Sequence, residues 1–445
     1  MWSVESITVG VGIIAALLSL SVFWLTCTNL IVGVASVLLL LVCETVYVAM
    51  PAIRLGILVY PQDFIFAMLA GAAGLRFSTV RSPREIPRPW LVLVLLLFVN
   101  FGVGLARYGS MAGVEFRPYF YTIAGALYVM SFPAEARSYR RVFIFWIVAA
   151  LSVCAVAFYR WTMIALGLEN YAWLDTTGIE GRVINSSQAL VLTTAVAITL
   201  FGLLRKVVAK GWLMALPLLL VTIAGSQQRT VWVATAASLL LVFVLAGQRR
   251  GSLLTVLGIV GTLGVAVAYP LATSGRLDSA ASSISTTASA GMSTRTGTFV
   301  GRVGAWKESL KEYASWNPLY QMVGKQFGVG YSVWIGTKEF GNAPHNYYIQ
   351  TMLRAGFIGV VALLGTYLLV LRRLFSVYGP MEGAARVLWV AIAVEMVYSI
   401  TYSPTFVQSI VYGAALAIAA QLKQQPLSDS IKIANETNSR PAYLS

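Results

Sequence analysis

Residues 343–359, "APHNYYIQTMLRAGFIG", join a polar segment to an apolar run that begins at Tyr347 and extends to about residue 370. An apolar run of roughly 20 residues is long enough to cross a bilayer as an α-helix. The same stretch contains His345, which is the only histidine of the chain. It therefore predicts a membrane-spanning helix with one imidazole at its entrance.

Apolar runs of this kind recur along the whole chain. Of its 445 residues, 58% are hydrophobic and 11% are charged, whereas a soluble domain has about 25% charged residues. The pattern predicts an all-α polytopic membrane protein with twelve or thirteen spans, because the first two runs almost touch. The predicted spans lie near 7–26, 28–49, 57–75, 90–105, 118–132, 142–165, 184–204, 211–225, 230–247, 252–271, 347–370, 386–402 and 405–422.

The basic residues predict the orientation of these spans. Short basic clusters fall in alternate loops, and by the positive-inside rule such loops face the cytoplasm. The net charge of +15 is scattered between spans, so membrane topology and anionic membrane lipids explain it better than nucleic acid does. The clusters are "RFSTVRSPREIPR" from Arg76, "ARSYRR" from Ala136, "RKVVAK" from Arg205, "QRR" from Gln248 and "LRR" from Leu371.

Two further features of the sequence limit the class of protein. The first apolar run lacks a basic leader and a second run follows at once, so we expect no cleavable signal peptide. The three cysteines lie in or between apolar runs without metal-ligand spacing, and we expect neither a disulfide framework nor a zinc site.

The runs divide the chain into four parts: transmembrane helices with short loops (1–271), a large outer loop (272–346), carboxy-terminal transmembrane helices (347–422) and a cytoplasmic tail (423–445). The outer loop opens with a Ser/Thr-rich segment, 272–299, which has too few large apolar residues to form a core and which we expect to be mobile. Apolar residues then recur at helical spacing and predict an amphipathic helix near 302–316.

Most basic residues expected on the outer side are arginines rather than lysines, and they include Arg117, Arg182, Arg229 and Arg302. A guanidinium presents a planar fork suited to phosphate, so this face favours a phosphate-bearing ligand. Pairing with lipid headgroups or with carboxylates such as that of Glu115 remains the alternative for each of them.

Arg229 lies in "IAGSQQRTVWVA", where only a few polar residues, Gln228 among them, separate two apolar runs. A charge so close to hydrocarbon is costly unless it faces a polar cavity or a partner. The alternative is a hairpin cap whose side chain extends to water.

His345 precedes Asn346 at the predicted outer mouth of a helix. An imidazole titrates near neutrality and can accept a proton from a hydroxyl or donate a hydrogen bond to a phosphate oxygen. A structural histidine remains the alternative, and Glu339 is a second candidate base. Without another histidine or a cysteine cluster, we expect no metal ligand set.

These residues resemble a known signature. "HN", nine residues and "GFIG" (His345, Asn346, Gly356, Gly359) are similar to the pattern of the bacterial O-antigen ligase and Wzy-type polymerase superfamily. "GRVGAW", "NPLY" and "GVGY" resemble the outer loop of that family in the same order, and "SQQRTVW" resembles its arginine-bearing hairpin. The likeness is specific from about residue 225 to residue 363.

The resemblance implies a glycosyltransferase C-type membrane fold with one large periplasmic loop, in the bacterial inner membrane, with its active face periplasmic. It implies a donor glycan on undecaprenyl diphosphate, inversion at the anomeric carbon, and neither cofactor nor metal. His345 matches the family histidine beside the acceptor hydroxyl or the diphosphate, and Arg229 and Arg302 match arginines that hold the diphosphate. We expect five further residues to bind substrate: Asn346, Gln228, Arg117, Arg182 and Trp306.

The spacing is associated with the ligase branch, whose acceptor is the lipid A core, so we slightly favour a ligase. The alternative is a Wzy-type polymerase of O-antigen or exopolysaccharide repeats, whose acceptor is a second lipid-linked glycan. A protein O-oligosaccharyltransferase and a lipid-linked sugar flippase or transporter are further alternatives. A transporter would be expected to show an inverted repeat and helices interrupted at mid-membrane.

Overall fold

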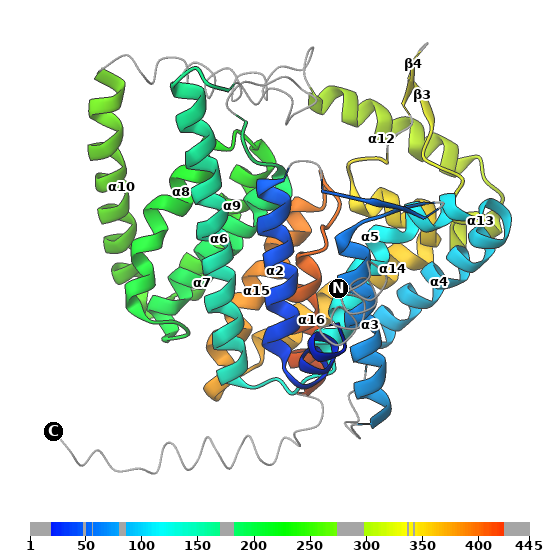
Figure 1. Ribbon diagram of the computed structural model, residues 1–445, viewed down its shortest axis with the longest axis horizontal. Helices are drawn as coiled ribbons and strands as arrows, with labels where there is room; N and C mark the ends of the chain where they lie inside the picture. Colours follow the sequence, from blue (N-terminus) through cyan, green and yellow to red (C-terminus); the bar gives the residue numbers. More distant parts are fainter. Residues whose placement is uncertain are drawn as a thin grey trace, which may run out of the picture.

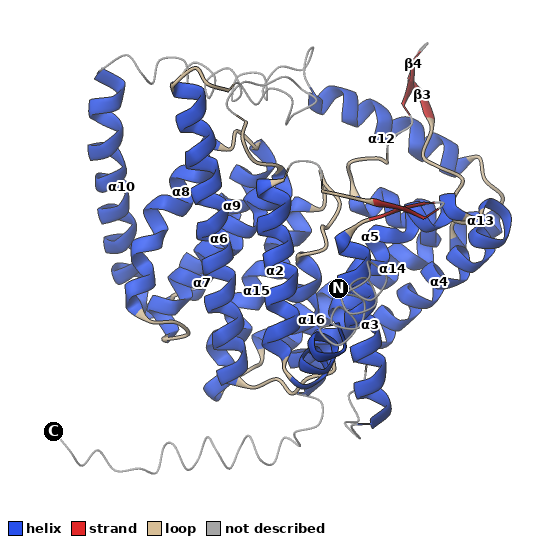
Figure 2. Cartoon of the chain, in the orientation of Figure 1, coloured by secondary structure: helices blue, strands red, loops and turns tan. Residues whose placement is uncertain are grey.

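The computed structural model describes residues 19–47, 50–55, 57–79, 86–169, 182–273, 298–335, 338–340 and 343–421. These residues form a helical bundle with two small β-hairpins (Figures 1 and 2). The longer helices are Ser19–Thr28, α2 (Leu30–Val46), α3 (Pro61–Thr79), α4 (Arg88–Tyr108), α5 (Ser110–Met130), α6 (Ala136–Ala165), α7 (Ser186–Arg205), α8 (Leu216–Gly225), α9 (Arg229–Leu245), α10 (Arg250–Thr273), α12 (Thr298–Ala314), α13 (Pro318–Val323), α14 (Tyr347–Phe375), α15 (Glu382–Tyr398) and α16 (Gln408–Gln421). Three short 3-10 turns are η2 (Lys210–Ala215), η3 (Gly247–Arg249) and η4 (Gly379–Met381), and the strands are β1 (Ile53–Leu55), β2 (Ile57–Val59), β3 (Val333–Ile335) and β4 (Lys338–Phe340).

The prediction of an all-α membrane protein is confirmed at the level of class. Within the described ranges, α4, α6 and α14 are each long and apolar enough to cross a membrane. Two pairs of helices meet this criterion together but are sharply bent: Ser19–Thr28 with α2, at 119°, and α9 with Gly247–Ile259, at 115°. By length and composition, the described residues therefore contain three candidate spans, or up to five if each bent pair is one span. The expected twelve or thirteen spans stay a prediction.

Several boundaries differ from the sequence-based expectation. The residues expected to form a loop between 105 and 118 are helical, because only Gly109 separates α4 from α5. The span expected from residue 57 begins instead in an antiparallel hairpin of β1 and β2, and its helix begins at Pro61. The segment expected to be an amphipathic helix corresponds to α12. Most of the Ser/Thr-rich segment and all of the tail from residue 423 lie outside the described residues.

The bundle packs around α16, whose residues from Gln408 to Ala420 are all buried. Helix α5 packs against α16 and α3, while α4 packs along α14. The outer surface keeps large apolar side chains such as Leu39, Leu95 and Leu368 exposed. Such a surface is what a lipid environment requires of a helical bundle.

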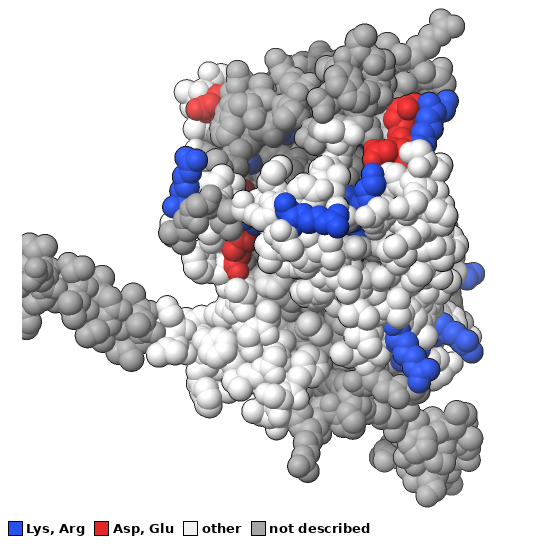
Figure 3. All heavy atoms as spheres, turned by 90° about the vertical axis from the view of Figure 1, so that its right-hand side faces the viewer, with Lys and Arg blue, Asp and Glu red and all other residues white. Residues whose placement is uncertain are grey.

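The two ends of the bundle differ in charge. Helix α12 and the hairpin of β3 and β4 lie over one end, which is uppermost in Figure 1. On the face seen in Figure 3, acidic and basic side chains both appear toward that end, whereas only basic ones appear toward the opposite end. The orientation that the basic loops predict stays a prediction.

Helix α14 is broken at Gly356, whose backbone has φ 67° and ψ −169°. A Cβ atom at this position would lie 2.2 Å from the carbonyl oxygen of Met322 in α13. The carbonyls freed by the break accept hydrogen bonds from outside the helix: Leu353 from the amide of Lys325 at 2.9 Å, and Arg354 from the side chain of Asn100 at 2.8 Å. The break therefore docks α13 and the loop after it onto the bundle.

A buried ion pair holds the same loop from the other side. Arg354, 2% exposed, pairs with Glu115 of α5. The second oxygen of Glu115 accepts a hydrogen bond from the amide of Gly328 at 2.6 Å, and Arg354 donates to the carbonyl of Gly330. Removing one partner of a buried pair typically costs about 3–5 kcal/mol, because the other charge is left uncompensated.

Candidate functional site

His345 occupies a fixed turn at the entrance to α14. The side chain of Asn346 caps the helix by accepting a hydrogen bond from the amide of Ile349 at 3.0 Å. One turn further on, Gln350 donates to the carbonyl of Pro344. Asn346 is 8% exposed, whereas His345 keeps part of its surface exposed. The backbone is thus held in place while His345 stays partly accessible. The amide oxygen of Asn346 is already engaged as the cap of α14. Its expected part in substrate binding stays a prediction.

Tyr402, in the turn between α15 and α16, brings three predicted site residues together. Its ring lies 6.0 Å from that of His345, in an edge-to-face arrangement at 66°. Arg302 of α12 lies over the same ring, with Cζ 4.7 Å from its centre, and donates to the Tyr402 hydroxyl at 3.3 Å. The hydroxyl in turn donates to Oε1 of Gln228 at 3.3 Å.

The electrostatic surroundings of His345 favour its neutral form. Partial burial lowers the pKa of the imidazole from its ordinary value of 6.5, and the positive charge of Arg302 lowers it further. An imidazole with a pKa below 6.5 is mostly unprotonated at pH 7 and can accept a proton. The arrangement therefore suits a general base.

Two further predicted site residues, Arg182 and Arg229, lie at the tight turn before α9. The turn residues Ser226, Gln227 and Gln228 are buried, and Gln227 has the unusual φ of 54°. Arg182 donates to the carbonyl of Gln227 at 3.0 Å, and its charge acts on Arg229, the first residue of α9. The guanidinium group of Arg229 has no hydrogen bond or ion pair to another described residue.

The start of α9 is tied to the same turn that contains Tyr402, because Thr401 and Thr230 share a 2.8 Å hydrogen bond. Helix N-termini attract anions through their free amides and their dipole. Among the described residues, no side chain caps the first turn of α9. Two guanidinium groups at such a terminus form a positive cluster that can hold a diphosphate.

The remaining predicted residues take different places. Trp306 lies one turn after Arg302 on α12, which packs against α14 and β3, and is half-buried. Arg117 is engaged elsewhere: it pairs with Asp63 at 3.0 Å, donates to the carbonyl of Leu58 at 2.7 Å and lies over the ring of Tyr60. Its described contacts fix the hairpin of β1 and β2, and none is to the residues around His345.

The role of the second candidate base stays a prediction. The side chain of Glu339, the second candidate base, lies outside the described part of the chain. No group of three or more metal-ligating side chains occurs among the described residues.

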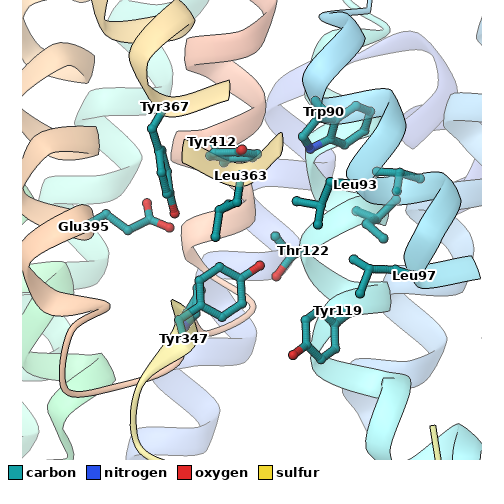
Figure 4. A pocket seen from close by; sticks show the side chains of 13 residues that line it. Trp90, Leu93, Leu97, Tyr119, Thr122, Tyr347, Leu363, Tyr367, Glu395 and Tyr412 are labelled. Carbon is teal, nitrogen blue, oxygen red and sulfur yellow. The ribbon is translucent and has the colours of Figure 1, made fainter. Parts of the chain in front are cut away.

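Tyr347, two residues after His345 in the chain, lines a pocket (Figure 4). The pocket has a volume of about 390 Å³, counted with the space open around it. Its lining is mainly apolar and aromatic. Glu395 of α15 is 4% exposed, and one of its carboxylate oxygens has no hydrogen-bond partner in the described structure. In Figure 4 its carboxylate points toward Tyr367. The pocket's other labelled residues are Trp90, Leu93, Leu97, Tyr119, Thr122, Leu363 and Tyr412.

Sequence reasoning missed Tyr402 and Glu395. Both lie within or beside a predicted apolar span, where a single tyrosine or glutamate gives no local pattern. An isolated carboxylate inside a span is itself a signal for function, since burying it is costly. Tyr402 offers no comparable signal, because its importance arises from contacts with residues about 100 and 174 positions away.

Comparison with known families agrees with the resemblance. Residues 213–364, about a third of the chain, match the family model described as O-antigen ligase. The matched part contains Arg229, Arg302, His345 and the broken start of α14, whereas Tyr402 and Arg182 lie outside it. No curated protein shows significant similarity to the chain.

Proposed function

We propose that this protein transfers a glycan from undecaprenyl diphosphate to the hydroxyl of a sugar acceptor. The observation that supports this most is that the family match contains His345, Arg302 and Arg229, and that contacts through Tyr402 and its neighbour Thr401 connect these residues from three separate segments. The family match supports a glycan-transferring ligase or polymerase in general. The donor and the acceptor are part of the proposal.

In the proposed reaction, His345 accepts the proton of the acceptor hydroxyl as its oxygen attacks the anomeric carbon of the donor. The new glycosidic bond forms on the face opposite the diphosphate, so the anomeric configuration is inverted. The bond between that carbon and the diphosphate oxygen breaks, and undecaprenyl diphosphate leaves with the electron pair. General-base catalysis of this kind contributes about 10²- to 10⁴-fold in rate.

Arg302, Arg229 and Arg182 would balance the charge that develops on the departing diphosphate. Guanidinium groups are suited to this because their forks match phosphate oxygens and their charge does not titrate near neutral pH. Donors fixed in advance stabilise developing charge, and removal of one donor typically costs about 10²- to 10³-fold in kcat. Gln228, Asn346 and Trp306 are proposed to position the sugars.

His345→Ala tests the chemistry. We expect transfer to fall at least about 100-fold, with the amount of membrane-inserted protein unchanged because His345 keeps part of its surface exposed. Tyr378→Ala is a matched control, since Tyr378 is 76% exposed and lies between α14 and α15 at the opposite end of the bundle. Full activity in the His345 variant would exclude this residue as the base.

The acceptor is tested by deleting the gene and examining the surface polysaccharide together with the lipid-linked pool. Naked lipid A core, with long polymer accumulating on the carrier, indicates the ligase, which we slightly favour. Core capped by a single repeat, or loss of a free exopolysaccharide with only single lipid-linked units remaining, indicates the polymerase. An unchanged surface polysaccharide and an unchanged lipid-linked pool would contradict both.

A further inference from the structure

A second pocket lies at the end of the bundle opposite α12, where α6 and α15 begin and α7 ends (Figure 1). Its volume is about 1250 Å³, counted with the space open around it. Five basic side chains and one carboxylate line it. They are Arg137, Arg140, Arg205, Lys206 and Arg249, with Glu382.

Most of this positive charge is not balanced by the residues that the structure describes. Glu382 pairs with Arg205 at 3.3 Å and lies 4.0 Å from Arg386. The other four cations of the lining have no ion pair among the described residues. Like charges gathered around one pocket repel one another, and an anion bound between them would relieve that repulsion.

The backbone adds a further attraction for an anion. Helices α6 and α15 both begin at this pocket. No described side chain caps the first turn of α6, whereas α15 continues from η4 and the amide of Glu382 already donates to the carbonyl of Gly379. Free amides and the helix dipole make such N-termini favourable to negative charge. Arg137 and Arg140 are three residues apart on the first turns of α6, so they lie on one face of the helix.

The close approach of two helix ends gives the pocket its shape. Gly383, in the first turn of α15, abuts the end of α7: a Cβ atom there would lie 2.5 Å from the side chain of Val207 and 3.3 Å from that of Arg205. Glycine therefore lets α7 present Arg205 and Lys206 beside the start of α15.

We propose that this pocket binds a phosphate-bearing anion, and that its natural source is the headgroup of an acidic phospholipid. The pocket lies at the end of a membrane-spanning bundle, and basic pockets between such helices are suited to phospholipid headgroups. Its volume is far larger than a single phosphate needs. The site is separate from the residues around His345 and does not depend on the proposed function.

The test is thermal unfolding of the purified full chain in detergent, with dioleoyl phosphatidylglycerol, dioleoyl phosphatidylcholine or inorganic phosphate added. A ligand that binds only the folded state raises the unfolding midpoint. We expect phosphatidylglycerol to raise it by about 3 °C or more over phosphatidylcholine. The Arg137→Gln/Arg140→Gln double variant should lose this shift, and the shift should weaken at high salt.

Arg88→Gln/Arg372→Gln is the matched control, because both of these arginines are exposed and lie outside the pocket. If the double variant unfolds before lipid is added, the single variants can be compared in the same way. Native mass spectrometry of the phospholipid retained through purification gives a second measure of binding. A pocket-dependent shift with inorganic phosphate alone would support the site with a soluble anion as its source. A phosphatidylglycerol shift that is equal in wild type, double variant and control would overturn the proposal.

Discussion

At the scale of single residues, the candidate site depends on Tyr402 as much as on the charged groups. The hydroxyl of Tyr402 accepts a hydrogen bond from Arg302 and donates one to Gln228, while the ring of Tyr402 lies against that of His345. Stacking on Tyr398, at 5.1 Å, fixes the plane of that ring. Tyr402 thus acts as a positioning residue for groups that come from α12, α9 and the start of α14.

Tyr402→Phe should lower kcat/KM for glycan transfer about tenfold, because it removes two hydrogen bonds but keeps the ring that stacks on Tyr398. The unfolding midpoint should stay within about 2 °C of the wild type. Tyr348→Phe is the control, since its hydroxyl donates to the carbonyl of Met396 at 2.8 Å, away from the arginines. Equal losses of activity in both variants would argue against the positioning role.

The pH dependence of transfer should reveal the electrostatic effect of Arg302 on His345. A base must be unprotonated, so activity falls as the pH drops through the pKa of His345, which lies below 6.5. Arg302→Gln removes one cause of that lowering, and the midpoint of the acid limb should therefore move to higher pH. Lys307→Gln, an exposed change on the same helix, should leave the midpoint in place. An unmoved midpoint in the Arg302 variant would contradict this electrostatic effect.

The sequence predicts the residues whose chemistry is local and misses those defined by distant partners. His345, Arg302 and Gln228 lie in recognisable short contexts, and the structure brings them together around Tyr402. Arg117 has the same charge and the same predicted side, but its nearest carboxylate, Asp63, lies 54 positions earlier in the chain. Nothing local in the sequence distinguishes an arginine that forms an ion pair within the fold from one that is available to bind a ligand.

At the scale of elements, the start of α14 both carries the turn that contains His345 and docks α13. The docking depends on Gly356, a glycine of the recognised signature, where the helix is broken. Gly356 adopts a conformation that is essentially restricted to glycine. The break lets α13 approach, and Asn100 and Lys325 satisfy the carbonyls that the break exposes. Hydropathy predicts an uninterrupted span here, since a break made by contact with a distant loop leaves no mark on the apolar pattern.

Gly356→Ala should destabilise the protein by at least about 1–3 kcal/mol, because a side chain at this φ is strained and would collide with α13. The unfolding midpoint should fall by about 3 °C or more. Gly113→Ala, in α5, is the matched control: a Cβ atom there would meet nothing within 4 Å. A midpoint as high in the Gly356 variant as in the control would rule out the strained contact.

At the scale of the whole molecule, the two proposed binding regions lie at opposite ends of one bundle. The end with α12 presents His345, Arg302 and Arg229, whereas the other end presents the pocket around Arg137 and Lys206. The basic loops predict that the first end faces the periplasm and the second faces the cytoplasm. The transmembrane class was predictable from composition, but the small hairpins were not, because three-residue strands are too short to show a period.

Labelling of single introduced cysteines would test this orientation in intact cells. A membrane-impermeant maleimide should react with Leu319→Cys, on α13, and should reach Tyr378→Cys only after the cells are permeabilised. Both positions are highly exposed, at 66% and 76%. The native cysteines provide a low background, since Cys27 and Cys154 are buried and Cys43 is half-buried. The reverse pattern of labelling would place the candidate site in the cytoplasm.

The hydrogen bonds across the break in α14 also determine how this protein can be recombined with others. The segment 318–331 provides the amide of Lys325 to α14, while Asn100 and Glu115 provide the matching groups from α4 and α5. A chimaera that exchanges the outer segment alone would separate donors from acceptors within a membrane helix. The transplantable unit is therefore the segment together with α14 and these two side chains, and crossover points belong outside it.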